Sequence, residues 1–166
     1  MSESKLLWAP WRMEYVQAPK SESDGCIFCD KPKQDNDREN LVLFRGNKCS
    51  LLMNLYPYNN GHLMIAPYKH CSSTDDLCKE TYVEIMSLAD KSMRILEKTM
   101  HPQGFNFGAN IGEAAGAGIA EHIHFHIVPR WNGDTNLMPV VGHTKVMVQG
   151  LRETFDLLKP EFDQLG

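Results

Sequence analysis

The feature that most constrains the fold is a run of alternating histidine and apolar residues at positions 121–131, Glu-His-Ile-His-Phe-His-Ile-Val-Pro-Arg-Trp. The histidines are His122, His124 and His126, and the apolar residues between and after them are Ile123, Phe125 and Ile127. Strict alternation predicts a β-strand over this range, with the apolar side chains in the core. We expect the three imidazoles to project from the other face, about 6–7 Å apart. Three titratable rings on one face add little to stability. The pattern therefore favours a reaction site or a metal site over a chance arrangement on a solvated face.

Composition and charge narrow the class of protein. The chain has 166 residues, 42% hydrophobic and 23% charged, which is enough for one domain with a sizeable core. The net charge of −4 argues against a nucleic acid partner bound through its phosphates, but not against a small anionic ligand. No apolar run approaches the ~18 residues of a membrane span, and the first eight residues lack the layout of a signal peptide. The five cysteines are an odd number, so we expect reduced thiols and a cytoplasmic location.

Short apolar runs separated by turn residues predict an α+β fold built on an antiparallel meander sheet. The expected strands are residues 41–45, 48–55, 62–66 and 104–111, followed by the histidine run. Gly46-Asn47 would form the turn between the first two strands. Residues 30–40 are polar and are expected to form a loop.

One long helix and a C-terminal helix are predicted beside the sheet. Ser73-Thr-Asp-Asp76 resembles a capping box and would open a helix to about Met100, which His101-Pro102 would end. An apolar stripe on this helix is expected to pack in the core; it consists of Tyr82, Ile85, Met86, Ala89, Met93, Leu96 and Met100. Residues 144–158 are expected to form the second helix, ending near Pro160.

Cys26-Ile-Phe-Cys29 places two cysteines at the spacing of a zinc half-site or a redox pair. A thioredoxin-like redox pair would precede a helix, whereas Asp30-Lys-Pro-Lys33 and a polar loop follow here. A second Cys-x-x-Cys is absent, so a zinc ion would need histidines from elsewhere. The spacing favours zinc and leaves a redox pair and buried thiols as alternatives.

Three chemistries fit the histidine run. The first is a catalytic metal with a hydrolytic water, the second is attack of an imidazole on phosphorus, and the third is a zinc-stiffened binding module without turnover. The glycine-rich loop Gly112–Gly118 precedes the run, and small residues let backbone N–H groups approach phosphate oxygens. A hydrolytic metal more usually takes carboxylates, and only Glu113 and Glu121 are close in sequence. Nucleophilic phosphorus chemistry is favoured, and the other two stay open.

His122-Ile-His-Phe-His-Ile-Val128 matches the His-φ-His-φ-His-φ-φ signature of the histidine triad (HIT) family, where φ is apolar. Other segments that resemble the family are Asn110-Ile-Gly-Glu-Ala-Ala-Gly116, Val128-Pro-Arg-Trp131 and Asn54-x6-Gly61-His-Leu-Met-Ile-Ala-Pro67. Leu7-Trp-Ala-Pro-Trp-Arg-Met13 and the segment 130–139 are similar to a bacterial branch of diadenosine tetraphosphate phosphorylases and hydrolases. The resemblance spans nearly the whole chain.

The resemblance implies an enzyme that cleaves a nucleotide at its α-phosphate linkage, with phosphate or water as acceptor. His124 would be the nucleophile that forms a nucleotidyl-imidazole intermediate, and His126 would contact the α-phosphate and the scissile bridge. The nucleotide-binding residues implied are Asn54 at the ribose, His62 at the phosphate site, and Asn110, Gly116 and Gly118 along the phosphate region. Diadenosine tetraphosphate is the expected type of substrate, and a nucleoside phosphoramidate or adenylate is the alternative within the family.

In zinc-carrying relatives, two cysteines, a histidine after the third strand and the first triad histidine hold the metal. This site maps onto Cys26, Cys29, His70 and His122, which implies a structural Zn²⁺ with four protein ligands. The resemblance also implies a homodimer. We expect a single HIT-like domain over residues 1–166, divided into an N-terminal arm (1–25), a core (26–131) and a C-terminal extension (132–166).

One position departs from the family pattern. Many relatives carry Gln followed by Ser or Thr shortly before the triad, where this chain has Gly118 and Ile119, or Ala117 and Gly118 if the gap is set differently. The acceptor is therefore left open: His126 is typical of hydrolases, whereas the N-terminal arm is similar to that of phosphorylases. His143 receives no role from the sequence.

Overall fold

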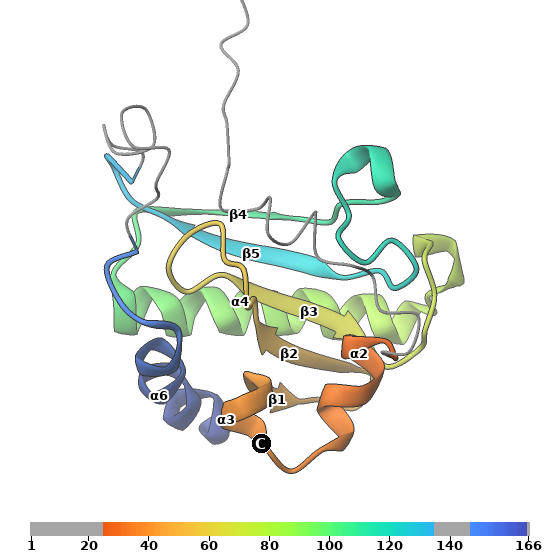
Figure 1. Ribbon diagram of the computed structural model, residues 1–166, viewed down its shortest axis with the longest axis horizontal. Coiled ribbons are helices and arrows are strands. Elements are labelled where there is room, and N and C mark those ends of the chain that lie inside the picture. The colour runs from red at the N-terminus through yellow and green to blue at the C-terminus, as the bar shows by residue number, and fades with distance from the viewer. Residues whose placement is uncertain (1–24, 135–146, 166) are drawn as a thin grey trace, which may run out of the picture.

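A computed structural model describes residues 25–134 and 147–165. Its centre is a five-stranded antiparallel sheet with the strand order β1-β2-β3-β5-β4 (Figure 1). The strands are β1 (Val42–Arg45), β2 (Cys49–Met53), β3 (Leu63–Pro67), β4 (Gly104–Gly108) and β5 (Phe125–Arg130). The α-helices are α2 (Ile27–Asp30), α3 (Asp37–Asn40), α4 (Lys79–Met100) and α6 (Leu151–Phe162). The 3₁₀ turns are η2 (Lys31–Lys33), η3 (Thr74–Asp76), η4 (Glu113–Ala115) and η5 (Asp163–Leu165).

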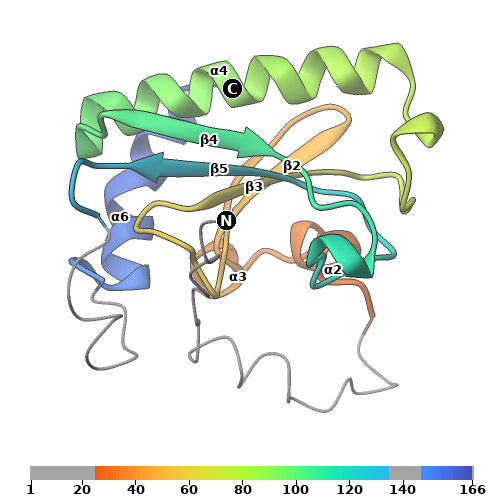
Figure 2. The same cartoon turned by 90° about the horizontal axis from the view of Figure 1, so that it is seen from above.

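The sheet confirms the predicted α+β fold. β1, β2 and β3 form the expected antiparallel meander, and β5 pairs with β3 and separates it from β4. β4 is consequently an edge strand. Figure 2 shows α4 along one face of the sheet, with α2 and α3 on the other side.

Alternating side chains of the strands enter two apolar clusters. The first cluster lies between the sheet and the helices α4 and α6, and it includes Leu51, Met53, Ile65, Ile85, Leu96, Ile127 and Phe162. The second cluster lies on the opposite face, and it consists of Phe28, Val42, Leu52, Met64 and Ala66. The switch from Leu51 to Leu52 to Met53 follows the two-residue period of a strand. Both faces of the sheet are therefore covered, and α2 supplies the cover on the second face through Phe28.

The predicted histidine strand is shorter than its alternation suggests. β5 begins at Phe125 rather than at residue 121, so that His122 and His124 precede the strand. The ladder with β3 reaches only as far as the pair Ile65 and Phe125, because the Ile123 N–H donates to the Cys71 carbonyl, 2.7 Å away, in the segment after β3. The side-chain alternation still holds, since Ile123 and Ile127 are buried in the first cluster.

The long helix begins later than predicted, and its buried face is different. Ser73 caps the short turn η3, its Oγ accepting from the Asp75 N–H, and α4 starts at Lys79. Met86 is 57% exposed, so its place in the predicted core stripe was wrong, and Tyr82 is exposed as well. The buried face is Thr81, Ile85, Leu88, Ala89, Ser92, Ile95 and Leu96. Small polar residues take part in this face, which a stripe of apolar residues alone omits.

The last helix ends at Phe162, close to the predicted end near Pro160, whereas the expectation for residues 30–40 was wrong. Pro160 lies inside α6 and does not end it, because Leu158 and Phe162, one turn apart, are both fully buried and hold the helix together across the proline. The polar segment 30–40 contains η2 and α3 instead of a continuous loop. The predicted start of the last helix at residue 144 lies outside the described residues, and α6 begins after Gly150.

In the described parts of the chain, no helix combines the length and the apolar character needed to cross a bilayer. The division into arm, core and extension stays a prediction, because much of the arm and of the extension lies outside the described residues.

Phe162 provides a test of the packing beyond Pro160. Phe162→Ala is expected to lower the free energy of unfolding by about 3–5 kcal/mol, because it removes a fully buried ring from the first cluster. Leu157→Ala in the same helix, at a side chain that is 41% exposed, should change it by less than about 0.5–1 kcal/mol. Urea unfolding of both variants measures the difference, and equal losses would contradict the packing described.

Candidate active site and metal cluster

The triad histidines lie on the face of the sheet that α2 covers. His126 pairs with Met64 of the second cluster, and paired residues of neighbouring strands share a face. The ring centroids of His124 and His126 are 4.8 Å apart and nearly perpendicular, which is closer than the expected spacing along a strand. His62, just before β3, joins them, with its ring centroid 5.0 Å from that of His126. The structure therefore brings four imidazoles together, counting His122 at the far end.

His124 has one ring nitrogen held and one left for chemistry. Its Nδ1 lies 2.9 Å from the His122 carbonyl oxygen, which can only accept, so Nδ1 carries the proton and Nε2 carries a lone pair. The side chain is 5% exposed, and burial lowers the pKa of His124 below its usual value, although the hydrogen bond to the carbonyl raises it. A neutral imidazole with a fixed tautomer is what nucleophilic attack requires.

His62 and His126 form a hydrogen-bonded pair. The Tyr58 N–H donates to His62 Nδ1 at 3.0 Å, so the proton of neutral His62 is on Nε2. That Nε2–H donates to His126 Nδ1 at 2.9 Å. Neutral His126 then carries its own proton on Nε2, as a donor. His124 and His126 thus carry their protons on different ring nitrogens despite their equivalent spacing.

Four side chains predicted as metal ligands converge at the other end of the histidine run. Cys26, Cys29, His70 and His122 each offer a ligand atom, and these atoms all lie within 4.8 Å of one another. His122 Nδ1 lies 3.1 Å from Cys26 Sγ, 3.5 Å from Cys29 Sγ and 3.2 Å from His70 Nδ1. Ligands at Zn–S of about 2.3 Å and Zn–N of about 2.0–2.1 Å in a tetrahedron would be roughly 3.3–3.8 Å apart. The donor set and its spacing fit a zinc ion.

The outer nitrogen of His122 is anchored as metal-bound histidines usually are. His122 Nε2 lies 2.8 Å from the Pro67 carbonyl oxygen and donates its proton there, which leaves the Nδ1 lone pair facing the two thiols. Burial lowers the pKa of His122. Burial and the neighbouring Cys26 raise the pKa of Cys29 to about 11, so a cation binding there releases a proton.

The turn between the two cysteines explains how both reach the cluster. The Cys26 carbonyl accepts from the N–H groups of Cys29 and Asp30, each at 2.9 Å, and closes one helical turn. Phe28 inside this turn is buried in the second cluster. Its ring centroid lies 5.3 Å from that of His122 and 4.6 Å from that of His124. Phe28 therefore anchors the cysteine turn and covers the nucleophile candidate. The sequence did not predict this role.

The other predicted nucleotide-binding residues are less closely engaged. The side chain of Asn54 braces the connection before β3, with Oδ1 accepting from the Tyr56 N–H at 2.9 Å and Nδ2 lying 3.3 Å from His62 Nδ1. Asn110 is half-buried in the connection between β4 and η4, whereas Gly116 and Gly118 are exposed. Gly116 has a φ of +83° and closes η4, a conformation that favours glycine. His143 lies outside the described residues.

The connection between β2 and β3, residues 54–62, is fixed to the end of β5. Asn59 is buried, and its Nδ2 donates to the Pro129 carbonyl at 3.0 Å and to Asp134 Oδ2 at 2.9 Å. Asp134 also accepts from Arg130 Nε at 2.6 Å. Residues 54–62 are therefore held at Asn54 and again at Asn59, and these two anchors keep Tyr58 and His62 in place.

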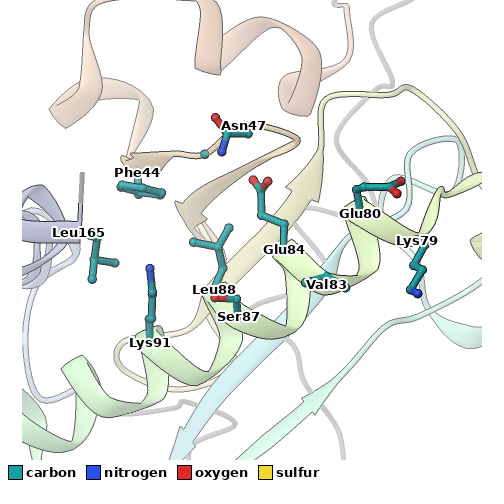
Figure 3. Close-up of a pocket in the computed structure, with 11 residues that line it drawn as sticks. Phe44, Asn47, Lys79, Glu80, Val83, Glu84, Ser87, Leu88, Lys91 and Leu165 are labelled. Atoms are coloured by element: carbon teal, nitrogen blue, oxygen red, sulfur yellow. The ribbon is translucent and has the colours of Figure 1, made fainter.

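A cavity of about 540 Å³ lies away from the histidines, between α4 and the β1–β2 turn (Figure 3). Phe44, Leu88 and Leu165 form its apolar part, and Lys79 and Lys91 lie along α4. The described residues that line it include no histidine and no cysteine. Its size alone does not make it the reaction site, because the groups with chemistry are on the other face of the sheet.

Comparison with known proteins decides the family. The HIT domain profile matches residues 36–133, which is more than half of the chain. An AP-4-A phosphorylase of Mycobacterium tuberculosis is 42% identical over 163 residues, covering 94% of this chain and 83% of the relative. The chain belongs to the HIT family. The resemblance drawn from the triad motif is thereby confirmed.

Other proteins resemble this chain over part of its length. A solved zinc-bound histidine triad family protein from Mycobacterium smegmatis superimposes with a TM-score of 0.61 at 25% identity, covering 75% of this chain and 85% of that protein. A bis(5'-adenosyl)-triphosphatase of Dictyostelium discoideum is 29% identical over 93 residues, covering 56% of this chain and 62% of the relative.

The structure places Gly118 and Ile119, the residues that depart from the HIT pattern. Ile119 packs against the second apolar cluster, and Gly118 has no side chain. This pair can offer only backbone groups to a phosphate oxygen.

Proposed function

We propose that this HIT-family protein is an enzyme that cleaves dinucleoside polyphosphates such as diadenosine tetraphosphate at an α-phosphate, through a covalent nucleotidyl-His124 intermediate. The observation that carries the proposal is the tautomer of His124: a buried, neutral imidazole whose Nδ1–H is bound to a carbonyl and whose Nε2 is left as the nucleophile. The similarity to an AP-4-A phosphorylase along 94% of the chain supports this class of substrate.

The reaction would run in two steps, formation and breakdown of the nucleotidyl-histidine. In the first, the Nε2 lone pair of His124 forms a bond to the α-phosphorus, and the bridging oxygen leaves with the electron pair of the P–O bond. His126, whose proton is on Nε2, would donate a hydrogen bond to that oxygen. In the second, an oxygen of phosphate or water attacks the same phosphorus, and the N–P bond breaks with its electron pair returning to Nε2, which regenerates neutral His124. An attacking water gives up a proton to the solvent. Phosphate would give a nucleoside diphosphate, and water a monophosphate.

The remaining predicted residues would bind the nucleotide. Asn54 would contact the ribose, His62 the phosphate region through its pair with His126, and Asn110 with Gly116 and Gly118 the phosphate oxygens. Asn54 Oδ1 keeps a second lone pair beside its bond to the Tyr56 N–H, which is available to a ribose hydroxyl.

We propose further that Cys26, Cys29, His70 and His122 hold a structural zinc ion. Two thiolates and two imidazoles are a common set of ligands for structural zinc, and four protein ligands leave no position for a reacting water. When bound, zinc would tie the cysteine turn to the segment after β3 and to the start of the histidine run. The zinc ion would take no part in the reaction itself. His122 would contribute through its backbone carbonyl, which accepts the hydrogen bond from His124 Nδ1. The expected cytoplasmic location also stays a proposal, which cell fractionation would test.

A homodimer formed along β4 is the third part of the proposal. β4 is an edge strand (Figure 1), and its Phe107 is 37% exposed. Figure 2 shows α4 running beside it, and this helix exposes Tyr82 and Met86. A second copy that paired its own β4 alongside would extend the sheet and bury these apolar side chains.

His124→Ala tests the reaction. We expect turnover of diadenosine tetraphosphate to fall by about 10³-fold or more, with the fold retained by circular dichroism. His101→Asn, at an exposed histidine beyond α4, should leave turnover unchanged. Unchanged turnover in His124→Ala would overturn the mechanism, and no turnover by the wild type on any nucleotide would favour a binding module. Product analysis with and without inorganic phosphate separates a phosphorylase from a hydrolase.

Elemental analysis tests the metal. Protein purified without chelator is expected to contain about one zinc per chain, given four ligands that form one closed site. Cys26→Ser should lose most of this zinc and lower the free energy of unfolding before it affects turnover. Cys78→Ser, at an exposed cysteine outside the cluster, should retain the zinc. Wild-type protein without zinc would refute the assignment.

Light scattering after gel filtration tests the dimer. The wild type should have twice the mass of one chain, and Phe107→Glu combined with Met86→Glu should halve it, because charges would be buried at the proposed contact. Val148→Glu, at an 87% exposed position, serves as the control. A wild-type monomer, or a dimer unaffected by the double change, would contradict this interface.

A further inference from the structure

Tyr58 contacts both members of the histidine pair at the end of the triad. Its ring is stacked on His62, with centroids 4.7 Å apart and planes at 23°, and is tilted against His126 at 5.8 Å. Its backbone N–H donates to His62 Nδ1 at 3.0 Å. One residue therefore constrains the plane of the His62 ring and the position of its proton.

The plane of His62 matters because its hydrogen bonds depend on it. Nδ1 has to face the Tyr58 N–H while Nε2 faces His126 Nδ1 at 2.9 Å. A rotation of the ring about its bond to Cβ moves both nitrogens out of line, and hydrogen bonds weaken steeply with misalignment. His126 would then lose the donor that keeps the proton off its Nδ1, and both of its tautomers would become populated.

The backbone around Tyr58 is held independently of its side chain. Asn54 Oδ1 accepts from the Tyr56 N–H on one side, and the Asn59 amide bonds to the Pro129 carbonyl on the other. A change confined to the Tyr58 side chain therefore removes the stacked ring and leaves the backbone donor in place. This separation makes the contribution of the ring measurable.

We propose that Tyr58 is a positioning residue: its ring clamps His62 so that His126 presents its Nε2–H to the bridging oxygen of the substrate. This inference rests on the proposed function, which assigns His126 to that oxygen. Tyr58 itself touches no reacting atom. It acts through His62, and its effect should appear in the rate of the bond-breaking step rather than in substrate binding.

Three variants and two measurements test the proposal. Tyr58→Leu removes the aromatic face, Tyr58→Phe keeps it, and Leu55→Ala changes an exposed apolar side chain of the same connection. For Tyr58→Leu we expect kcat on diadenosine tetraphosphate to fall about 3- to 10-fold, which corresponds to the free energy that an aromatic pair contributes. We expect KM to change by less than about 2-fold. Tyr58→Phe, which keeps the stacked ring, should lose much less kcat than Tyr58→Leu, and Leu55→Ala should match the wild type.

The second measurement reads the proton positions without turnover. Long-range ¹H–¹⁵N spectra distinguish the two histidine tautomers, and the His62 and His126 signals should show single tautomers in the wild type and in Tyr58→Phe, but a mixture in Tyr58→Leu. If Tyr58→Leu fails to fold, Tyr58→Met, which also lacks a ring, takes its place. Wild-type tautomers in a folded variant without the ring would overturn the proposal. If the wild type lacks turnover, the proposed function fails, and the spectra still decide whether Tyr58 sets the tautomers.

Discussion

The site depends on three hydrogen-bonding atoms of His122. Nδ1 faces the thiols of Cys26 and Cys29, Nε2 donates to the Pro67 carbonyl at 2.8 Å, and the backbone carbonyl accepts from His124 Nδ1 at 2.9 Å. The three interactions use different atoms, so all can form at once. They join the cysteine turn, the end of β3 and the nucleophile candidate through a single fully buried residue. A displacement of His122 would therefore move His124 as well.

Proton positions distinguish histidines that are equivalent in the sequence. His122 and His124 each donate to a backbone carbonyl, but through different nitrogens, whereas His126 accepts from another imidazole. The first arrangement leaves Nδ1 for a metal, the second leaves Nε2 for phosphorus, and the third leaves an N–H for an oxygen. The different roles therefore follow from the hydrogen-bond partner of each ring, which is a carbonyl acceptor for His122 and His124 and an imidazole donor for His126. Period-two spacing provides only the common face.

Local patterns predicted the elements, and long-range contacts set their limits. The strands and both main helices follow from periodicity, because side-chain burial depends on the repeat of the backbone. The histidine strand was predicted too long because the Ile123 N–H bonds to Cys71, a partner outside the sheet. His70 is 41 residues from Cys29 and 52 from His122, so no local spacing could include it among the ligands, and only the family resemblance did. Phe28 was missed because its role is a ring contact across the fold. Tyr58 was missed because it lies in a turn-rich connection without periodicity, where its stacking on His62 is visible only in the structure.

The cysteine turn shows why a metal is useful at this position. α2 has four residues, far fewer than an isolated helix needs to be stable in water. Its place depends on the burial of Phe28 and on the cluster that its cysteines form with His70 and His122. The same Phe28 ring covers His124, and burial is the main cause of the lowered pKa that keeps this imidazole neutral. A zinc ion that fixed the turn would thus preserve the dry surroundings of the nucleophile without touching the substrate.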